Sequence, residues 1–95
     1  MNDADDRKAA TLIHRSQIAG LLREVADLLE LRGENPFRSR AYANGARAIE
    51  GMAEDPQDLY EAGTLGEVRG IGPGLVAGIA EIVLTGSLAL LTELR

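Results

Sequence analysis

The chain has no cysteine and only one histidine, His14. Without thiols it can form neither disulfide bonds nor a thiolate metal site, and a single imidazole cannot hold a metal cluster. Long apolar runs are also missing, because no stretch approaches the roughly 18 apolar residues of a membrane-spanning helix. The first residues are acidic where a signal peptide is basic, so the sequence predicts a cytoplasmic protein, bacterial in style, with no membrane partner.

Basic residues are scarce as well. Ten Lys and Arg stand against fifteen Asp and Glu, which leaves a formal net charge of −5, and Lys8 is the only lysine. This balance argues against binding nucleic acid by total charge, since such domains usually carry a basic patch or stripe. The distribution is uneven, because Arg38, Arg40 and Arg47 cluster between an acidic start and an acidic stretch over residues 54–61.

The length of 95 residues indicates a single small domain. A chain of this size buries only about 60–65% of its unfolded surface, so its stability should be a few kcal/mol. Residues 1–15 begin with an acidic run and lack a strong apolar period, which predicts a flexible or weakly helical tail. Residues 16–95 show apolar residues at helical spacing and are predicted to form a compact all-α bundle of four to six short helices.

Start and stop signals divide this bundle into helices. Asn35-Pro36 and Asp55-Pro56 each place an N-cap before a proline at the first helical position, and Ser16 and Ser87 are further predicted N-caps. Glycines stand where left-handed residues would end the helices, at Gly33, Gly63 and Gly86. These signals predict helices near 17–32, 36–52, 56–62, 65–68, 73–84 and 87–94, and no strand.

The helix predicted over 36–52 has two faces. Its apolar positions are expected to face inward: Phe37, Ala41, Ala48, Ile49 and Met52. On another face Arg40, Asn44 and Arg47 fall three or four residues apart, with Arg38 and Tyr42 near its edges. This face is either an ordinary solvated arginine face or a surface that presents guanidinium groups to a ligand. Gly45 predicts a close contact with another helix.

The segment from Thr64 to Leu75 has the pattern of a helix, a turn and a second helix. Thr64 and Glu67 are spaced as a capping box, which would start one short helix. Gly70-Ile71-Gly72 must end that helix, and Pro73 supplies the preset φ for the first turn of the next. The amides of Gly72, Gly74 and Leu75 are then predicted to point out of its N-terminus, where the helix dipole favours an anion. The alternative is a turn that only connects two elements.

The apolar residues around the turn favour the first interpretation. Leu65 and Val68 precede it and Leu75 follows it, so the segment resembles the helix-hairpin-helix motif. The resemblance implies that the turn grips a nucleic-acid phosphate without reading bases. It also implies that Ile71, the apolar residue between two glycines, tucks back and holds the two helices together.

Several separated motifs resemble the N-terminal, 8-kDa-type domain of bacterial family X DNA polymerases, the DNA polymerase beta-like family. They are GENPFRSRAY from Gly33, ARAI from Ala46, GIGPG from Gly70 and TGSL from Thr85, and they agree in order and spacing over most of the chain. The resemblance implies a compact helical domain that binds gapped or nicked DNA near the 5′-phosphate of the downstream strand during repair. Such a protein would be associated with the bacterial nucleoid.

The residues expected to contact DNA come from the turn and from the arginine-rich helix: Gly70, Ile71, Gly72, Gly74, Leu75, Arg38, Arg40, Tyr42, Arg47 and Arg69. The resemblance further implies a monovalent cation, Na⁺ or K⁺, held by the main-chain carbonyls of Gly66, Val68 and Ile71, since carbonyl oxygens suit hard cations. No other cofactor is expected. The expected partner is DNA, bound by a monomer, with a polymerase domain or a repair protein as a further partner.

Some members of the resembled family are 5′-deoxyribose phosphate lyases that use a lysine to form a Schiff base. By alignment of the turn, the nucleophile position falls on Gly78 and a phosphate-binding lysine position on Gly74, while other basic positions have become Ala43 and Asn44. Neither glycine nor arginine supplies a reactive amine. We therefore expect no lyase activity and no catalytic residue, with Lys8 or the α-amine as the remaining candidate amines.

Three functions remain open from the sequence. The first is a DNA-binding module, either the N-terminal part of a family X DNA polymerase or a free-standing relative. The second is a lyase, which the missing lysines disfavour. The third is a helical protein-interaction domain that has lost DNA binding, which the net charge of −5 favours.

Overall fold

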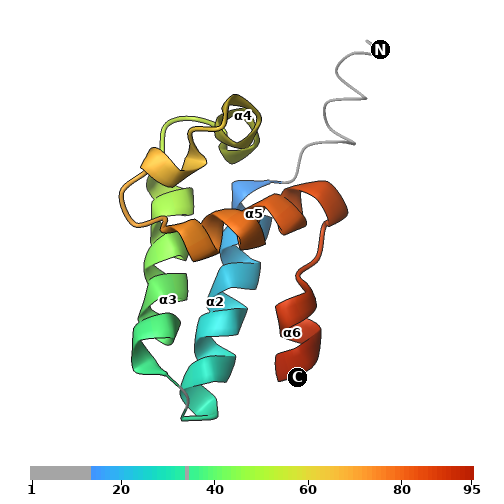
Figure 1. Cartoon of the computed structure of the whole chain (residues 1–95). Helices are drawn as coiled ribbons and strands as arrows, with labels where there is room; N and C mark the ends of the chain where they lie inside the picture. The colour runs from blue at the N-terminus through green and yellow to red at the C-terminus, as the bar shows by residue number, and fades with distance from the viewer. Residues whose placement is uncertain (1–13, 34) are drawn as a thin grey trace.

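The structure is a computed structural model that describes residues 14–33 and 35–95, and within these residues it contains five α-helices, one short 3₁₀ helix and no strand (Figure 1). This confirms the all-helical prediction, and every expected helix is present within a few residues of its predicted ends. Residues 1–13 of the predicted tail, with Lys8, lie outside the described part. The elements are α2 (Arg15–Leu31), α3 (Pro36–Gly51), α4 (Pro56–Ala62), η1 (Leu65–Glu67), α5 (Pro73–Thr85) and α6 (Ala89–Leu94).

Helices α2 and α3 form an antiparallel pair joined by a short connection (Figure 1). Gly33 takes a φ of 67° at the end of α2, as the sequence predicted. The side chain of Asn35 then accepts hydrogen bonds from the amides of Phe37 and Arg38 at 3.2 Å each, which confirms it as the N-cap of α3. Between the helices, the buried Ser39 hydroxyl donates to the Ala26 carbonyl at 3.0 Å. This hydrogen bond joins the two helices inside their interface.

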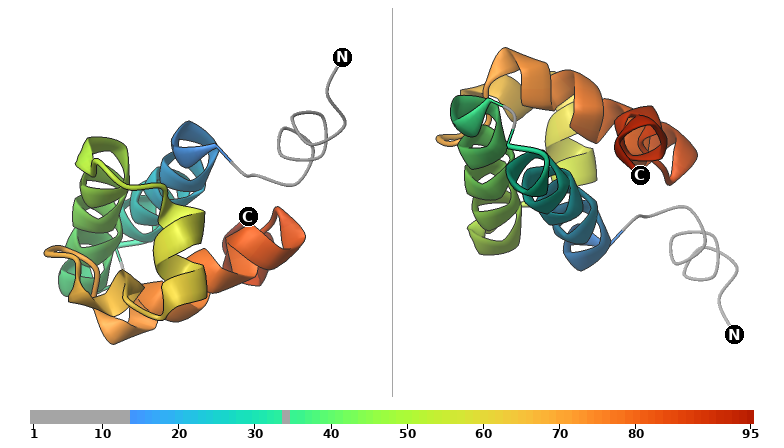
Figure 2. Two further views of the ribbon diagram at one scale, coloured as in Figure 1. Left: turned by 90° about the horizontal axis from the view of Figure 1, so that it is seen from above. Right: turned by 90° about the horizontal axis from the view of Figure 1, so that it is seen from below.

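Helix α5 crosses one side of the α2–α3 pair, and α6 returns along α2 (Figures 1 and 2). The core lies where these helices meet. Its largest fully buried side chains come from α2, α3, η1 and α5: Ile18, Leu22, Val25, Leu29, Ile49, Leu65, Ile79 and Ile82. Leu91 of α6, at 2% exposure, packs against them. At the other end, Arg15 of α2 donates to the carbonyls of Met52 and Glu54, the latter at 3.1 Å. The start of α2 is thereby tied to the connection that leads into α4.

Two predicted N-caps are wrong. Helix α2 begins one residue before Ser16, with His14 in the cap position and no side-chain cap. Helix α6 begins at Ala89 rather than directly after Ser87. Its first amide, that of Ala89, donates to the Glu81 carboxylate at 2.6 Å, while the amide of Ser87 donates to the Thr85 hydroxyl. The tertiary approach of α5 to α6 therefore supplies a cap that sequence spacing does not show.

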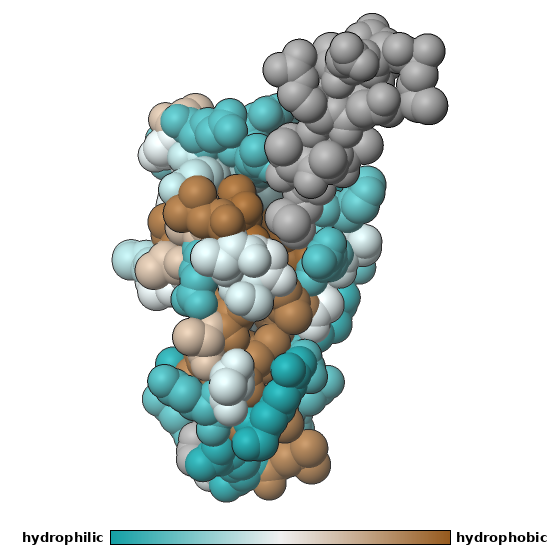
Figure 3. Space-filling model, turned by 90° about the vertical axis from the view of Figure 1, so that its right-hand side faces the viewer, coloured by the Kyte–Doolittle hydropathy of each residue, from teal (hydrophilic) through white to brown (hydrophobic). Residues whose placement is uncertain are grey.

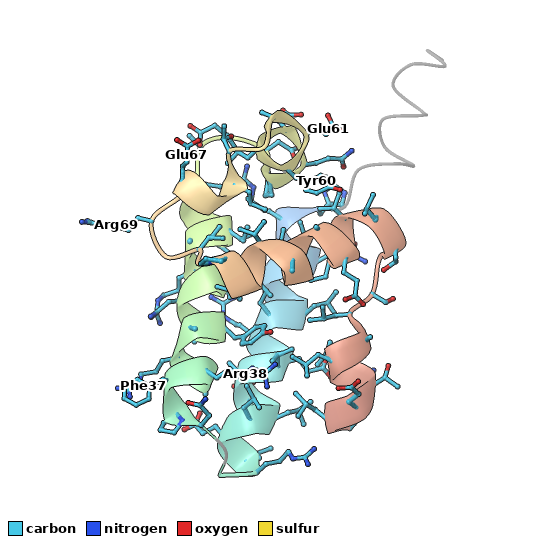
Figure 4. The ribbon with its side chains drawn as sticks, viewed as in Figure 1. Phe37, Arg38, Tyr60, Glu61, Glu67 and Arg69 are labelled. Carbon is cyan, nitrogen blue, oxygen red and sulfur yellow. The ribbon has the colours of Figure 1, made fainter. Side chains whose placement is uncertain are left out.

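Three predicted orientations on α3 are also wrong. Phe37 was expected to face inward, yet its side chain is 77% exposed, and Ala41 is exposed as well. Tyr42, expected at the edge of the arginine face, is buried at 8% exposure. The reason is visible in Figure 4, where Phe37 lies in the first turn of α3, at the end that α5 does not cross. The other expected inward residues, Ala48, Ile49 and Met52, are buried or half-buried.

Within the described part, no helix combines the length and the apolar character that crossing a lipid bilayer requires.

Candidate nucleic-acid interface

The turn between η1 and α5 is anchored at both of its central residues. The side chain of Ile71 is only 3% exposed and belongs to the core, as predicted, and its amide donates to the Val68 carbonyl at 3.1 Å. Gly70 has a φ of 94°, which strongly favours glycine. A Cβ at Gly70 would lie 3.3 Å from the Cβ of Ala48, so the turn packs directly on α3.

The predicted capping box at Thr64 is wrong. The Thr64 side chain makes no cap hydrogen bond to η1, and the Glu67 amide donates to the Thr64 carbonyl instead, at 3.0 Å. Because α4 ends at the left-handed Gly63, the Thr64 hydroxyl lies against the last turn of α4 and donates to the Leu59 carbonyl at 3.4 Å. The carbonyls at the end of α4 thus take the hydroxyl that a capping box on η1 would need. In addition, η1 is a single 3₁₀ turn rather than an α-helix.

The N-terminus of α5 presents two free amides rather than three. The Gly72 carbonyl accepts from the amides of Leu75 and Val76, at 3.0 and 3.1 Å. The prediction that the Leu75 amide points outward is therefore wrong. The amides of Gly72 and Gly74 have no hydrogen-bond partner within the described residues, and a Cβ at either glycine would meet nothing within 4 Å. Both glycines therefore lie at the positive end of the α5 dipole with unpaired amides and with no bulk beside their Cα atoms.

A hollow of about 280 Å³ lies between the turn and α3. It is lined by Arg38, Ala41, Tyr42, Gly70, Gly72, Gly74 and Leu75. Arg38 stands over the Tyr42 ring, with its guanidinium carbon 5.9 Å from the ring centre. The fold thus brings one cation from α3 to the same hollow as the two free amides of α5. We call this the hairpin hollow.

Four exposed arginines have no carboxylate partner within the described residues: Arg38, Arg40, Arg47 and Arg69. Other arginines are neutralised internally, since Arg23 pairs with Glu50 and Arg95 pairs with Glu24 at 2.8 Å. Ion pairing within the protein thus leaves the positive charge of the α3 and hairpin arginines available. An anionic ligand can use it without first breaking a salt bridge.

The predicted DNA-contacting arginines do not all lie in one place. Arg38 lines the hairpin hollow, whereas Arg40 lines a different hollow together with Glu30. The Arg40 guanidinium lies over Phe37, 5.1 Å from the ring centre, and its Nε donates to the Pro36 carbonyl. Arg69 extends outward from the hairpin (Figure 4), and Arg47 donates to the Asn44 side chain. Of these four arginines, Arg38 is the one that lines the hairpin hollow with Gly70, Gly72 and Gly74.

Sequence reasoning misassigned two residues of α3 to the core. Ala41 was expected in the core and instead lines the hairpin hollow. Phe37 was also assigned to the core and is instead an exposed aromatic ring. The sequence does carry a signal for Phe37, because it directly follows a proline at the first position of α3.

The predicted cation ligands lie on η1 and the turn. Of their three carbonyls, that of Val68 accepts the Ile71 amide. A carbonyl oxygen has two lone pairs, so this hydrogen bond is compatible with a cation contact, and the Na⁺ or K⁺ site stays a prediction. Within the described part, no group of three or more His, Cys, Asp or Glu side chains could hold a metal ion.

Comparison with known proteins gives two related results. Residues 13–88 match the helix-hairpin-helix domain family. The chain is also 32% identical, over 83 residues, to the DNA polymerase/3′-5′ exonuclease PolX of Bacillus subtilis (strain 168). That alignment covers 87% of this chain but only 14% of the relative, so the chain spans a small part of the relative's length. The chain therefore belongs to the helix-hairpin-helix domain family and is a distant homologue, over most of its length, of a family X DNA polymerase.

Proposed function

We propose that this chain is a DNA-binding domain that grips the phosphate backbone without reading sequence. The observation that carries the proposal is the hairpin hollow, which is lined by Arg38 and by Gly72 and Gly74, whose amides have no partner within the described residues. Helix N-termini bind phosphate because their free amides and the helix dipole both favour an anion. Neither glycine carries a side chain that would keep a phosphate at a distance.

The hollow has the chemistry of backbone recognition. Its lining includes one guanidinium, that of Arg38, and no Asn, Gln or carboxylate. We expect this guanidinium, next to the unpaired amides, to contact a phosphate rather than a base edge. Arg69 and Arg47, both without carboxylate partners, would extend the positive surface along the duplex. Arg40 lies at the border with the hollow that contains Glu30, and Tyr42, Ile71 and Leu75 would act by shaping the site from behind.

The DNA we propose is gapped or nicked DNA in repair, with the hairpin near the 5′-phosphate of the downstream strand. The domain would be the N-terminal domain, or a free-standing relative, of a family X DNA polymerase, and would bind as a monomer. The homology to a protein named DNA polymerase/3′-5′ exonuclease supports this role. A Na⁺ or K⁺ ion held by the carbonyls of Gly66, Val68 and Ile71 would bridge the turn and the phosphate.

The experiment is a fluorescence titration of the chain with gapped DNA carrying a 5′-phosphate, at two salt concentrations. We expect salt-dependent binding. Gly72→Val should weaken this binding by about tenfold, because the valine side chain would keep the phosphate away from the amide. A hydrogen bond to a charged group contributes about 1.5–3 kcal/mol. Gly51→Val is the matched control, because Gly51 also has open space around its Cβ position but lies at the end of α3. Equal affinities of both variants would show that the hairpin does not hold DNA.

The second candidate is a helical protein-interaction domain that has lost DNA binding. The net charge of −5 favours it. The same titration separates the two functions, because the second predicts no binding even at the lower salt concentration.

A further inference from the structure

A second pair of hollows lies at the end of the α2–α3 pair where the two helices connect. One, of about 490 Å³, is lined by Glu30, Gly33, Pro36, Ser39 and Arg40. The other, of about 410 Å³, is lined by Asp27, Glu30 and Leu31. They adjoin each other because both use Glu30. We call their combined surface, with the Phe37 ring beside Arg40, the α2–α3 end surface.

Large apolar side chains are unusually exposed on this surface. Leu31 is 82% exposed and Phe37 is 77% exposed, and the one comparably exposed large apolar residue elsewhere in the described part is Leu84, at 69%, near the end of α5. Figure 3 shows hydrophobic surface next to hydrophilic surface at the lower end of the molecule, where α2 ends. Exposed apolar side chains gathered at one end of a fold and flanked by polar residues are a candidate protein interaction site.

The carboxylates on α2 indicate which charge a partner segment carries. Asp27 and Glu30 have no hydrogen-bond or ion-pair partner within the described residues, whereas Glu24 is paired with Arg95. Two unpaired carboxylates beside Leu31 repel a phosphate backbone and attract a basic side chain. The α2 side of this surface is therefore acidic, while Arg40 adds one cation on the α3 side; the hairpin hollow, by contrast, contains a cation and no carboxylate.

We propose that the α2–α3 end surface binds a segment of a partner protein that carries a bulky apolar residue next to Lys or Arg. The apolar residue covers Leu31, and the basic residues pair with Asp27 and Glu30. The lining of this surface shares no residue with that of the hairpin hollow. The domain can therefore hold a protein and a DNA phosphate on two different surfaces. This inference does not depend on the hairpin binding DNA.

The first test uses a synthetic helical peptide made of Leu and Lys as the probe. The ¹⁵N-labelled 95-residue chain is titrated with this peptide and, in parallel, with a peptide of the same pattern in which Glu replaces Lys. We expect amide shifts concentrated in residues 27–40 with the Lys peptide and none with the Glu peptide. Shifts concentrated elsewhere, such as on α4, would overturn the proposal.

Matched variants then separate a specific surface from general charge attraction. Asp27→Lys with Glu30→Lys should weaken the Lys peptide by about tenfold, as loss of a central contact does. Glu61→Lys with Glu93→Lys makes the same change in net charge on α4 and α6 and should change the affinity by less than about twofold. Leu31→Ser should weaken binding, whereas Leu84→Ser should not. The proposal would be overturned if the two double variants lost the same affinity for the Lys peptide, or if Leu31→Ser and Leu84→Ser did.

Two further measurements test whether DNA or a second copy of this chain binds the α2–α3 end surface instead. Leu31→Ser should leave the affinity for gapped DNA unchanged, and a loss would mean that this surface belongs to the DNA site. Sedimentation equilibrium should show a monomer at the concentrations of the titration. A dimer that Leu31→Ser abolishes would overturn the proposal in favour of a second copy of this chain.

Discussion

Leu75 of α5 packs on Gly45 of α3 so closely that a Cβ at Gly45 would lie 2.6 Å from the Leu75 Cδ1. Sequence reasoning predicted a close helix contact at Gly45, and the structure confirms it and identifies the partner. Leu75 also lines the hairpin hollow, so this contact sets the distance between α3, which carries Arg38, and the free amides of α5. A glycine in a helix interior is thereby linked to the geometry of the proposed phosphate site.

Gly45→Val should lower the free energy of unfolding by about 1–3 kcal/mol, because it inserts methyl groups where Leu75 already fills the space. The measurement is urea unfolding followed by circular dichroism. The variant should also weaken binding to gapped DNA, because Leu75 and the start of α5 must shift. Wild-type stability of Gly45→Val would mean that α5 can move away from α3 at little cost.

Gly20→Ala is expected to do the opposite. Gly20 lies in the interior of α2, is exposed, and has nothing within 4 Å of its Cβ position. Replacing glycine by alanine at such a site removes backbone freedom from the unfolded chain and should raise the free energy of unfolding by about 0.5–1 kcal/mol. The same urea experiment measures it. A destabilised Gly20→Ala would indicate a packing contact on this face of α2.

Arg38→Ala should weaken binding to gapped DNA by at least about tenfold, given that a charge-assisted hydrogen bond contributes about 1.5–3 kcal/mol. The slope of log affinity against log salt should become shallower by about one. Titrations at four or more salt concentrations measure both. Arg23→Ala is the matched control. Arg23 of α2 is paired with Glu50 of α3, so its removal should leave the slope unchanged. Equal slopes for the two variants would remove Arg38 from the site.

Borohydride trapping on pre-incised abasic DNA should give no covalent adduct above that of an unrelated protein with the same N-terminus. A Schiff base needs a neutral primary amine, and an ordinary lysine with a pKa of about 10.4 is mostly protonated at pH 7. Gly74 and Gly78 offer no amine, and arginine stays protonated. An efficient adduct that is lost in Lys8→Ala would show that the chain is a lyase that uses an amine outside the hairpin.

Several features of this protein follow from the sequence alone, because they depend on neighbouring residues. The caps at Asn35 and Asp55, the prolines after them and the left-handed Gly33, Gly63 and Gly86 are local signals, and each delimits a helix in the structure. The burial of Ile71 was expected from the resemblance to the helix-hairpin-helix motif, and the structure confirms it. The family could be inferred in the same way, from motifs in a fixed order.

Other features were decided only by the tertiary structure. Whether Phe37 is buried depends on where α5 crosses α3, and the crossing point is set by contacts such as Gly45 with Leu75. The Thr64 hydroxyl donates to the Leu59 carbonyl of α4 and the Glu81 carboxylate of α5 caps α6, because groups on a neighbouring helix compete with the expected caps for hydrogen-bond partners. The placement of Arg38 and Arg40 in different hollows was also decided by the tertiary structure. Arg38 and Arg40 are two residues apart, and on a helix this spacing directs them to different sides, so only the packing of α5 decides which one meets the free amides of Gly72 and Gly74.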